Sequence, residues 1–305
     1  MITFDKFNIQ NYSKCFVVTD GKLSQLYNIV GNNVFLLPQG EEAKRLQHAE
    51  EICRWLLHFG AEKDDVLVAI GGGSIGDVTG FAASVYKRGI KLLHVPTTLI
   101  AQIDSSIGGK TAVNLDGVKN AVGTFYRADT LIDVDFLKTL DAKQRQNGNG
   151  ELLKYRMLDK NINEVYLHGN LTDTIKACVA YKQQICEADP FDTDKRKVLN
   201  FGHTVGHALE LSMGLSHGEA VASGLYYETL IAVKLGLCSA TYLENWRNEI
   251  LRHFPLQQIS KQHLQLTAQD KKNACGKVCL VLPCGDQFVL RYLPLSEIVE
   301  LLCND

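Results

Sequence analysis

A short run of branched apolar residues that ends at a cluster of glycines is the strongest constraint on the fold of this chain. Residues 66–70 read Val-Leu-Val-Ala-Ile, and residues 71–77 read Gly-Gly-Gly-Ser-Ile-Gly-Asp. The apolar run is typical of a strand buried on both faces of a parallel sheet. Glycines between a strand and a helix let the backbone approach a ligand, and N–H groups at a helix start attract anions. Because the order differs from Gly-x-Gly-x-x-Gly, the segment predicts either a phosphate-binding turn for a nucleotide or a simple tight turn.

Strands and helices alternate through the first half of the chain. Apolar, β-branched runs predict further strands at 14–20, 33–37, 91–95 and 130–135. Helical patterns lie between them, at 23–30, from the turn at 38–44 through 59, and through 86 after the glycines. Such alternation predicts a doubly wound parallel sheet.

The pattern becomes helical from Glu151 onward, apart from a strand-like run at 277–283. A chain of 305 residues is long for one hydrophobic core. We therefore predict an α/β protein with an N-terminal Rossmann-like parallel-sheet domain over 1–147 and a mainly α-helical domain over 148–305.

Composition excludes several classes of partner. The formal net charge is −2, so no global field attracts nucleic acid or an anionic membrane. No apolar run approaches the roughly 18–20 residues that span a bilayer, and the first residues lack the layout of a signal peptide. The nine cysteines are scattered without a Cys-x-x-Cys pair, which argues against a disulfide framework. We expect a cytoplasmic protein with free thiols and no nucleic-acid or membrane partner.

Three histidines cluster in the second half. His203 and His207 are four residues apart, and His217 follows ten residues later, directly before Gly218 and Glu219. At helical pitch, a spacing of four places both imidazoles on one face. A catalytic zinc site commonly has three protein ligands, so the cluster predicts a metal or proton-relay site; the alternative is a helical hairpin with polar histidines at its rim. Three small residues beside the pair would let a ligand or a second helix approach closely: Gly202, Gly206 and Ala208.

Other polar residues have two interpretations each. The segment 100–125 is dense in glycine and in polar side chains, including Asp104, Lys110 and Asn120, and predicts a long functional loop for a phosphate or carboxylate, or else a solvated loop. Asp20 ends a predicted strand and suits either ribose hydroxyls or a helix N-cap. Glu151, which shares a helix face with Lys154, suits either a metal site or the surface.

Four longer motifs together resemble those of the 3-dehydroquinate synthase family of sugar phosphate cyclases. They lie at 71–77, at 96–111 (Pro-Thr-Thr through Gly-Gly-Lys-Thr), at 199–207 (Leu-Asn-Phe-Gly-His-Thr-Val-Gly-His) and at 217–221 (His-Gly-Glu-Ala-Val). The resemblance covers residues 20–283. It implies a Rossmann-like domain followed by a helical domain.

The resemblance implies a role for residues in both halves. Its metal ligands are Glu151, His203 and His217. Its catalytic residues are His207, Lys154 and Asp192. Its NAD-binding residues are Asp20, Glu41, Lys44, Gly72, Gly73, Ser74, Asp77, Thr97, Thr98, Lys119, Phe136 and Thr139. Its substrate-binding residues are Arg88, Asp104, Lys110, Asn120, Asn147, Lys182, Arg196, Asn200, Lys271 and Lys272.

The resemblance also implies a reaction. The substrate would be 3-deoxy-D-arabino-heptulosonate 7-phosphate and the products 3-dehydroquinate and phosphate, with NAD recycled and Zn²⁺ or Co²⁺ as the metal. An arginine such as Arg196 can bind a carboxylate bidentately. Arg88 resembles a family arginine that reaches the neighbouring subunit's phosphate, which implies a homodimer.

The chain departs from the family pattern in several places, and other functions remain open. Lys22 and Asp192 stand where the family usually has Asn and Glu. The N-terminus and the stretch between Glu151 and Lys182 are shorter than usual, so we expect a reduced helical domain. The alternatives are another sugar phosphate cyclase of the aminocyclitol or amino-shikimate type, a metal-dependent alcohol dehydrogenase of the glycerol type, and a non-catalytic scaffold.

Overall fold

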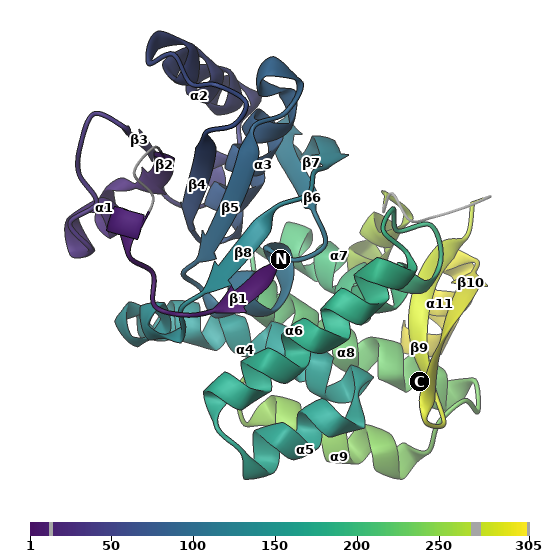
Figure 1. Cartoon of the computed structure of the whole chain (residues 1–305). Helices are drawn as coiled ribbons and strands as arrows, with labels where there is room; N and C mark the ends of the chain where they lie inside the picture. Colours follow the sequence, from purple (N-terminus) through teal and green to yellow (C-terminus); the bar gives the residue numbers. More distant parts are fainter. Residues whose placement is uncertain (12–14, 270–275, 304–305) are drawn as a thin grey trace. The chain divides into compact units, whose positions relative to one another are not determined.

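The computed structural model describes residues 1–11, 15–269 and 276–303. Within it the chain forms two compact units (Figure 1). Unit 1 contains Met1–Asp141 and the short segment Cys178–Gln183, and unit 2 contains Ala142–Ala177 and Gln184–Asp305. The predicted domain boundary at residue 147 stays a prediction.

Unit 1 is built on a six-stranded sheet with the order β1-β8-β5-β4-β2-β3. All of its pairings are parallel. The strands are β1 (Ile2–Phe4), β2 (Cys15–Asp20), β3 (Val34–Leu37), β4 (Val66–Gly71), β5 (Lys91–Pro96) and β8 (Asp129–Ile132). The predicted parallel-sheet domain is therefore confirmed. From β2 the chain runs outward to β3 and then crosses to β4 on the other side, so the strand order reverses between β2 and β4. In sheets of this kind ligands bind beyond the carboxyl ends of the strands at such a reversal.

Apolar side chains cover both faces of this sheet, as the continuous strand runs predicted. Leu67 of β4 packs in one cluster with α2 (Leu46–His58) and α3 (Gly73–Val85), whereas its neighbour Val68 packs in another cluster on the opposite face with Val17 and Phe136. Successive strand residues point to opposite faces, so two fully buried neighbours require a cover on each side. Helix α1 (Gly21–Leu26) of the same unit is shorter than the helix predicted at 23–30.

The polar segment after residue 100 is not a long loop, and this expectation was wrong. Residues 101–105 form the short helix η4 (Ala101–Ser105), and an antiparallel hairpin follows, with β6 (Lys110–Leu115) paired to β7 (Val118–Phe125). In β6, the buried residues Thr111 and Val113 alternate with the more exposed Lys110, Ala112 and Asn114, which is the period of a half-buried strand. Because glycine and polar side chains are abundant in this segment, the strand period is not recognisable in the sequence.

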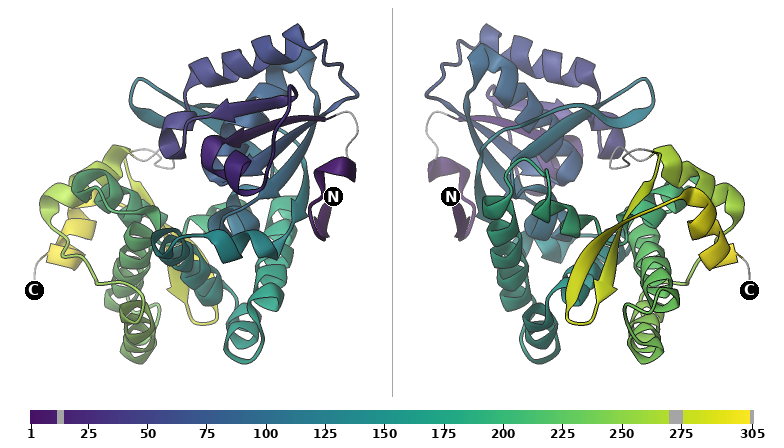
Figure 2. Two further views of the ribbon diagram at one scale, coloured as in Figure 1. Left: turned by 90° about the vertical axis from the view of Figure 1, so that its left-hand side faces the viewer. Right: turned by 90° about the vertical axis from the view of Figure 1, so that its right-hand side faces the viewer.

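Unit 2 is mainly helical, as predicted. Its helices are α4 (Ala142–Leu158), α5 (Lys160–His168), both ends of α6 (Leu171–Ala188), α7 (His203–Met213), α8 (His217–Lys234), α9 (Ala240–Leu251), α10 (Lys261–Gln265) and α11 (Leu295–Cys303), while Cys178–Gln183 within α6 belong to unit 1. The predicted strand-like run is confirmed as β9 (Val278–Cys284), which pairs antiparallel with β10 (Gln287–Leu293). Figure 2 shows this hairpin in yellow beside the green helices of its unit. Leu280 and Leu282 of β9 share a core with Val205 of α7 and Ile231 of α8.

Two other expectations can be compared with the described residues. None of the helices in the described ranges is both long and apolar enough to cross a bilayer. All eight cysteines in those ranges are free thiols. The short edge strand β1 was not predicted, since three residues are too few for a visible period.

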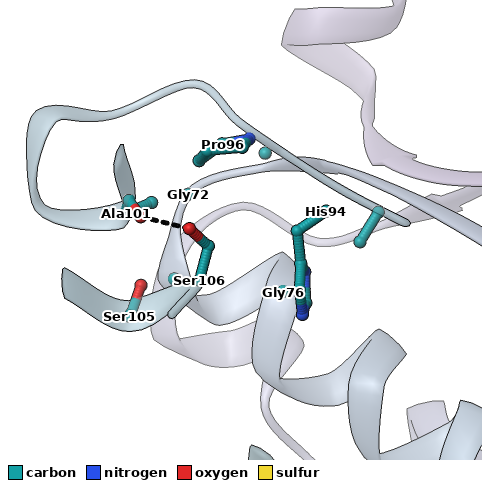
Figure 3. Close-up of a pocket in the computed structure, with 10 residues that line it drawn as sticks. Gly72, Gly76, His94, Pro96, Ala101, Ser105 and Ser106 are labelled. Atoms are coloured by element: carbon teal, nitrogen blue, oxygen red, sulfur yellow. Dashed lines mark hydrogen bonds between the residues drawn. The ribbon is translucent and has the colours of Figure 1, made fainter. Parts of the chain in front are cut away.

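A buried histidine beneath the glycine turn makes the stability of unit 1 depend on pH. His94 of β5 is 6% exposed and, with Gly72 and Gly76, lines a cavity of about 10 Å³ (Figure 3). Burial lowers the pKa of its imidazole from 6.5 to about 4. Between these values the unfolded chain binds a proton that the folded chain does not, so the free energy of unfolding decreases as pH falls.

We therefore predict that acidification from about pH 6.5 to about pH 4 removes about 3 kcal/mol through His94 alone, at about 1.4 kcal/mol per pKa unit. Urea denaturation at several pH values measures this for the wild-type chain and for His94→Gln, whose side chain does not titrate. The difference in free energy of unfolding between the two chains should change in this window. Parallel curves for the two proteins would contradict the prediction.

Candidate functional site

Three side chains from three helices of unit 2 form a group that could bind a metal ion. They are Glu151 of α4, His203 at the first position of α7, and His217 at the first position of α8. Their ligand atoms all lie within 4.8 Å of one another. One carboxylate and two imidazoles are donors that Zn²⁺ accepts, and such a set leaves a coordination position open.

Glycines allow the three helices to approach closely enough for this. A Cβ atom on Gly150 would overlap the backbone of Gly218, and one on Gly218 would overlap the backbone of Asn147, so α4 and α8 touch through their main chains. A Cβ atom on Gly206 would lie 2.9 Å from the carbonyl oxygen of Ala220. The small residues beside the histidines therefore admit a second helix, α8. Since Gly150 and Gly218 directly adjoin Glu151 and His217, the backbone contact brings these two ligands together.

Hydrogen bonds orient both imidazoles towards Glu151. The Nδ1 atom of His203 lies 3.1 Å from the carbonyl oxygen of Phe201, and Nδ1 of His217 lies 3.4 Å from a carboxylate oxygen of Glu210. These acceptors favour a proton on Nδ1. The Nε2 atoms of the two rings lie 3.6 and 3.5 Å from the same Glu151 oxygen. Metal-binding histidines are held in this way by an acceptor on the ring nitrogen that does not bind the metal.

The charge balance of the group also suits a cation. Glu151 is 0% exposed, and neither of its carboxylate oxygens accepts a hydrogen bond of normal geometry, although Lys154 forms an ion pair with it. A buried carboxylate without hydrogen bonds is costly, and a bound metal ion would remove that cost. Burial on its own would lower the pKa of His217, but the neighbouring carboxylates of Glu151 and Glu210 outweigh burial and raise the pKa to about 9.

Two residues with predicted catalytic roles lie beside this group. The His207 ring centroid is 5.4 Å from that of His203 and 6.5 Å from that of His217. Lys154 is buried one helical turn after Glu151 and donates a hydrogen bond to the carbonyl oxygen of Leu199 at 2.9 Å. The structure therefore brings two cationic or proton-carrying groups to the edge of the metal-binding group.

In the segment before α7, a single carboxylate, that of Asp189, binds the backbone up to Arg196. Asp189 accepts hydrogen bonds from the backbone N–H groups of Thr193, Asp194 and Arg196 at 2.7–3.1 Å. These hydrogen bonds, chiefly from the Thr193 backbone, lower the pKa of Asp189. The guanidinium of Arg196 is buried and donates to the carbonyl oxygen of Pro190. Asp192 lies within this segment in the left-handed region, with a φ of 57°, and Asn200 ends η6 (Lys195–Asn200).

In unit 1, the predicted nucleotide-binding residues lie at the carboxyl ends of the central strands. Gly72 and Gly73 follow β4 and begin α3, where no side chain caps the helix start. A Cβ atom on Gly73 would lie 3.0 Å from the Ser105 hydroxyl, and one on Gly72 would lie 3.1 Å from Thr98, so both positions favour glycine. Thr97 is tied to the end of β4 by a backbone hydrogen bond to Gly71. At the end of β2, Asp20 caps α1 by accepting from the N–H groups of Lys22 and Leu23, which is the second of its two interpretations.

A polar network joins the turn after β3, helix α3 with its glycine-rich start, and the β6–β7 hairpin. Lys44 donates to Asp77 at 2.6 Å and to Asn120 at 2.5 Å. Glu41 accepts from Asn114 at 2.8 Å and from the Ser74 hydroxyl at 3.5 Å. Burial raises the pKa of Asp77, and the charge of Lys44 acts in the opposite direction. Two residues predicted for different ligands, Lys44 for the nucleotide and Asn120 for the substrate, are thus in direct contact.

Two further pairs of predicted residues are placed together in unit 1. Phe136 packs edge-on against Tyr27, with ring centroids 4.7 Å apart, and the Tyr27 hydroxyl contacts that of Thr139 at 2.6 Å. Lys182 forms an ion pair with Asp104 at 2.8 Å.

Other predicted residues are exposed or outside the described ranges. Lys110 and Lys119 are exposed on the hairpin. Arg88 follows Lys87 in a turn where both have positive φ, and lines a groove of about 1060 Å³ at the amino ends of β4, β5 and β8. Lys271 and Lys272 lie outside the described residues.

Sequence reasoning did not recognise the supporting roles of four residues. Ser216 and Glu219 form a capping box that starts α8 and so places His217 in its first turn; the Ser-x-x-Glu spacing is its signal. Asp189, which holds the Arg196 segment, lies seven residues before that arginine, and Glu210 precedes His217 by the same separation. Neither spacing has a known signature.

Comparison with solved structures identifies the class of fold. The chain is similar to 2-epi-5-epi-valiolone synthase from Streptomyces hygroscopicus subsp. jinggangensis, solved with NAD+ and Zn²⁺ bound, with a TM-score of 0.84, 24% identity, and coverage of 99% of this chain and 95% of that chain. It is also similar to 2-deoxy-scyllo-inosose synthase in complex with carbaglucose-6-phosphate, NAD+ and Co²⁺, with a TM-score of 0.83, 25% identity and the same coverage. The chain therefore has the fold of the sugar phosphate cyclases.

Sequence comparison identifies the family within that class. Family models described as 3-dehydroquinate synthase N-terminal and C-terminal match residues 34–147 and 148–273. The 3-dehydroquinate synthase of Dictyoglomus thermophilum is 36% identical over 316 residues, covering 96% of this chain and 89% of that protein. That of Alkaliphilus metalliredigens is 37% identical over 318 residues, covering 95% and 89%. The chain belongs to the 3-dehydroquinate synthase family, which confirms the resemblance.

We predict that Gly150→Ala weakens both unit 2 and its metal-binding group. The added Cβ would overlap the backbone of Gly218, and such overpacking costs about 1–3 kcal/mol of the free energy of unfolding. Because α4 must move away from α8, Glu151 would also move away from His217, and zinc affinity should fall. Urea denaturation and zinc titration measure the two effects. Gly21→Ala is the matched control, since its Cβ meets no atom within 4 Å; equal results for both variants would contradict the close helix contact.

Proposed function

We propose that the chain is a 3-dehydroquinate synthase that converts 3-deoxy-D-arabino-heptulosonate 7-phosphate to 3-dehydroquinate and phosphate. The observation that carries the proposal is the convergence of Glu151, His203 and His217 within 4.8 Å in a chain of this family. A non-catalytic scaffold would have no reason to retain a fully buried carboxylate that lacks hydrogen bonds of normal geometry.

The residues present fit both cofactors. Glu151, His203 and His217 would bind a zinc or cobalt ion, because one carboxylate and two imidazoles suit such an ion and their ligand atoms lie within 4.8 Å of one another. Gly72 and Gly73 would bind the pyrophosphate of NAD at the start of α3. When bound, the metal would act as a Lewis acid on a substrate hydroxyl group, and NAD would accept a hydride and later return it.

Further residues of unit 1 would complete the NAD pocket in this proposal. They are Asp20, Glu41, Lys44, Ser74, Asp77, Thr97, Thr98, Lys119, Phe136 and Thr139. The Lys44–Asp77 ion pair would hold the helix start against the turn after β3.

The remaining chemistry needs only proton transfers by the chain's own residues. Phosphate leaves the substrate by β-elimination, the sugar ring opens, and an intramolecular aldol reaction closes the carbocycle. We assign these proton transfers to His207 and Asp192, since an imidazole can both accept and donate a proton near neutral pH. Lys154, ion-paired to Glu151, would keep that carboxylate charged and oriented.

The substrate has a carboxylate at one end and a phosphate at the other. Arg196 would bind the carboxylate bidentately, since its guanidinium is buried and its backbone is held by Asp189. The other proposed substrate contacts are Arg88, Asp104, Lys110, Asn120, Asn147, Lys182, Asn200 and, beyond the described residues, Lys271 and Lys272. The contact by Arg88 belongs to a homodimer, in which it would reach the phosphate bound by the partner subunit.

A cyclase for another sugar phosphate is the second candidate. The likeness to 2-deoxy-scyllo-inosose synthase, at a TM-score of 0.83, favours it. That alternative does not explain the well-positioned arginine at position 196, which suits a substrate that carries a carboxylate.

Phosphate release distinguishes the candidates. With NAD+ and Zn²⁺ added, we expect release from the heptulosonate 7-phosphate and none from glucose 6-phosphate or sedoheptulose 7-phosphate. No net NADH should accumulate, whereas a glycerol-type alcohol dehydrogenase would accumulate it. Turnover of the other sugar phosphates alone would overturn the proposal.

We predict that Glu151→Ala lowers kcat/KM by about 10³-fold or more, which corresponds to about 4 kcal/mol of transition-state stabilisation. The metal would lose its only anionic ligand, so elemental analysis should show zinc in the wild-type chain and not in the variant. Glu164→Ala, at an exposed position of α5, is the control and should keep both properties. Full activity of the Glu151 variant would rule out the proposed metal role.

A further inference from the structure

A second buried carboxylate lies close to the metal-binding group but is not part of it. Glu228 of α8 is 0% exposed. One of its oxygens accepts a hydrogen bond from the N–H of Gly202 at 2.8 Å, and the other accepts from the N–H groups of Thr204 and Val205 at 3.1 and 3.2 Å. None of the roles described above uses this side chain.

The three donors are the backbone on both sides of His203. Helix α7 begins at His203, and Gly202 before it is left-handed, with a φ of 76° and no side chain to cap the helix. The first N–H groups of a helix have no partner within the helix. Glu228 supplies that partner from the neighbouring helix, and its charge interacts favourably with the positive end of the α7 dipole.

The packing around Gly202 leaves this segment little freedom. A Cβ atom on Gly202 would lie 2.8 Å from the Leu225 side chain, and one on Gly224 would overlap the Gly202 carbonyl group. Leu225 and Gly224 belong to the same helix as Glu228. The carbonyl oxygen of Phe201, directly before Gly202, is the acceptor that orients the His203 ring. Glu228 therefore holds the main chain that aims His203 at Glu151.

We propose that Glu228 is a positioning residue of the metal site: it fixes His203 relative to His217, so that both imidazoles meet one ion. Helix α8 carries His217 at its first position and Glu228 eleven residues later, which is about three turns. One helix thus contributes a ligand directly and positions the second ligand through hydrogen bonds. The inference rests on the proposed function, since it requires that this group binds a metal.

A merely structural role predicts something different. If Glu228 only caps α7, its loss lowers the stability of the metal-free protein and leaves the zinc affinity of the folded protein unchanged. If it positions His203, zinc affinity also falls, because residues that orient metal ligands typically contribute about 10- to 100-fold to affinity.

The experiment compares the zinc affinity of Glu228→Gln, Glu228→Ala and the wild-type chain by competition with a chromophoric chelator, at a temperature where circular dichroism shows each to be folded. Glutamine keeps the shape but offers only one acceptor oxygen to three donors. We expect zinc affinity about tenfold weaker for Glu228→Gln and up to about 100-fold weaker for Glu228→Ala. The stabilisation of each folded protein by a fixed zinc concentration should shrink accordingly, since it depends on the dissociation constant.

Glu249→Gln is the matched control. Glu249 is also a poorly exposed carboxylate of unit 2, but it pairs with Arg156 at 2.8 Å and accepts from Arg252 at 2.6 Å. Its loss should lower thermal stability and leave zinc affinity at the wild-type value.

The outcomes separate this inference from the proposed function. Normal zinc affinity in both Glu228 variants, with Glu151→Ala unable to bind zinc, overturns the positioning role and leaves the metal site in place. Zinc affinity that falls equally in Glu249→Gln also overturns it, because general destabilisation would then explain the effect. A wild-type chain that binds no zinc overturns both.

Discussion

Main-chain contact between helices is the constraint on which the rest of unit 2 depends. Glycines at positions 150, 206, 218 and 224 let α4, α7 and α8 touch at distances that any side chain would prevent. That contact brings a carboxylate from one helix and an imidazole from each of the other two within 4.8 Å. The result is a fully buried carboxylate beside two partly buried imidazoles; it pairs with Lys154 and accepts no hydrogen bond of normal geometry. Such a group is costly for an empty site and suitable for a cation.

The two units of the chain meet separate chemical requirements. In unit 1 the reversal of strand order places Asp20 and the glycine turn at the same edge of the sheet, where a helix start can bind an anion. The hairpin that follows is tied to this edge through Lys44 and Asn120. In unit 2, Asp189, Glu210 and Glu228 accept hydrogen bonds from the Arg196 backbone, the His217 ring and the Gly202 backbone. Polar residues thus orient neighbouring side chains and backbone, whereas glycines and small apolar side chains provide the close packing.

Much of this could be predicted from the sequence, because the relevant signals are local. Continuous apolar runs such as 66–70 predicted parallel strands, and the spacing of His203 and His207 predicted a shared helix face. The hairpin at 110–125 was missed because its alternation is weak among glycines and polar residues. The histidine spacing alone could not show which imidazoles share a metal, and the ligand set Glu151, His203 and His217 came from the family resemblance. The side chains that converge are Glu151, His203 and His217. A backbone contact between glycines that are distant in the sequence brings Glu151 to the two histidines. Glu228 was missed for the same reason, since its three donors lie more than twenty residues away and leave no periodic pattern.

The most direct measurement is anomalous diffraction at the zinc absorption edge from crystals grown with Zn²⁺. The account predicts one strong anomalous peak per chain, about 2.0–2.2 Å from a Glu151 oxygen and from Nε2 of His203 and His217. A peak held by other residues, or no peak within bonding distance of these three, would contradict the central claim.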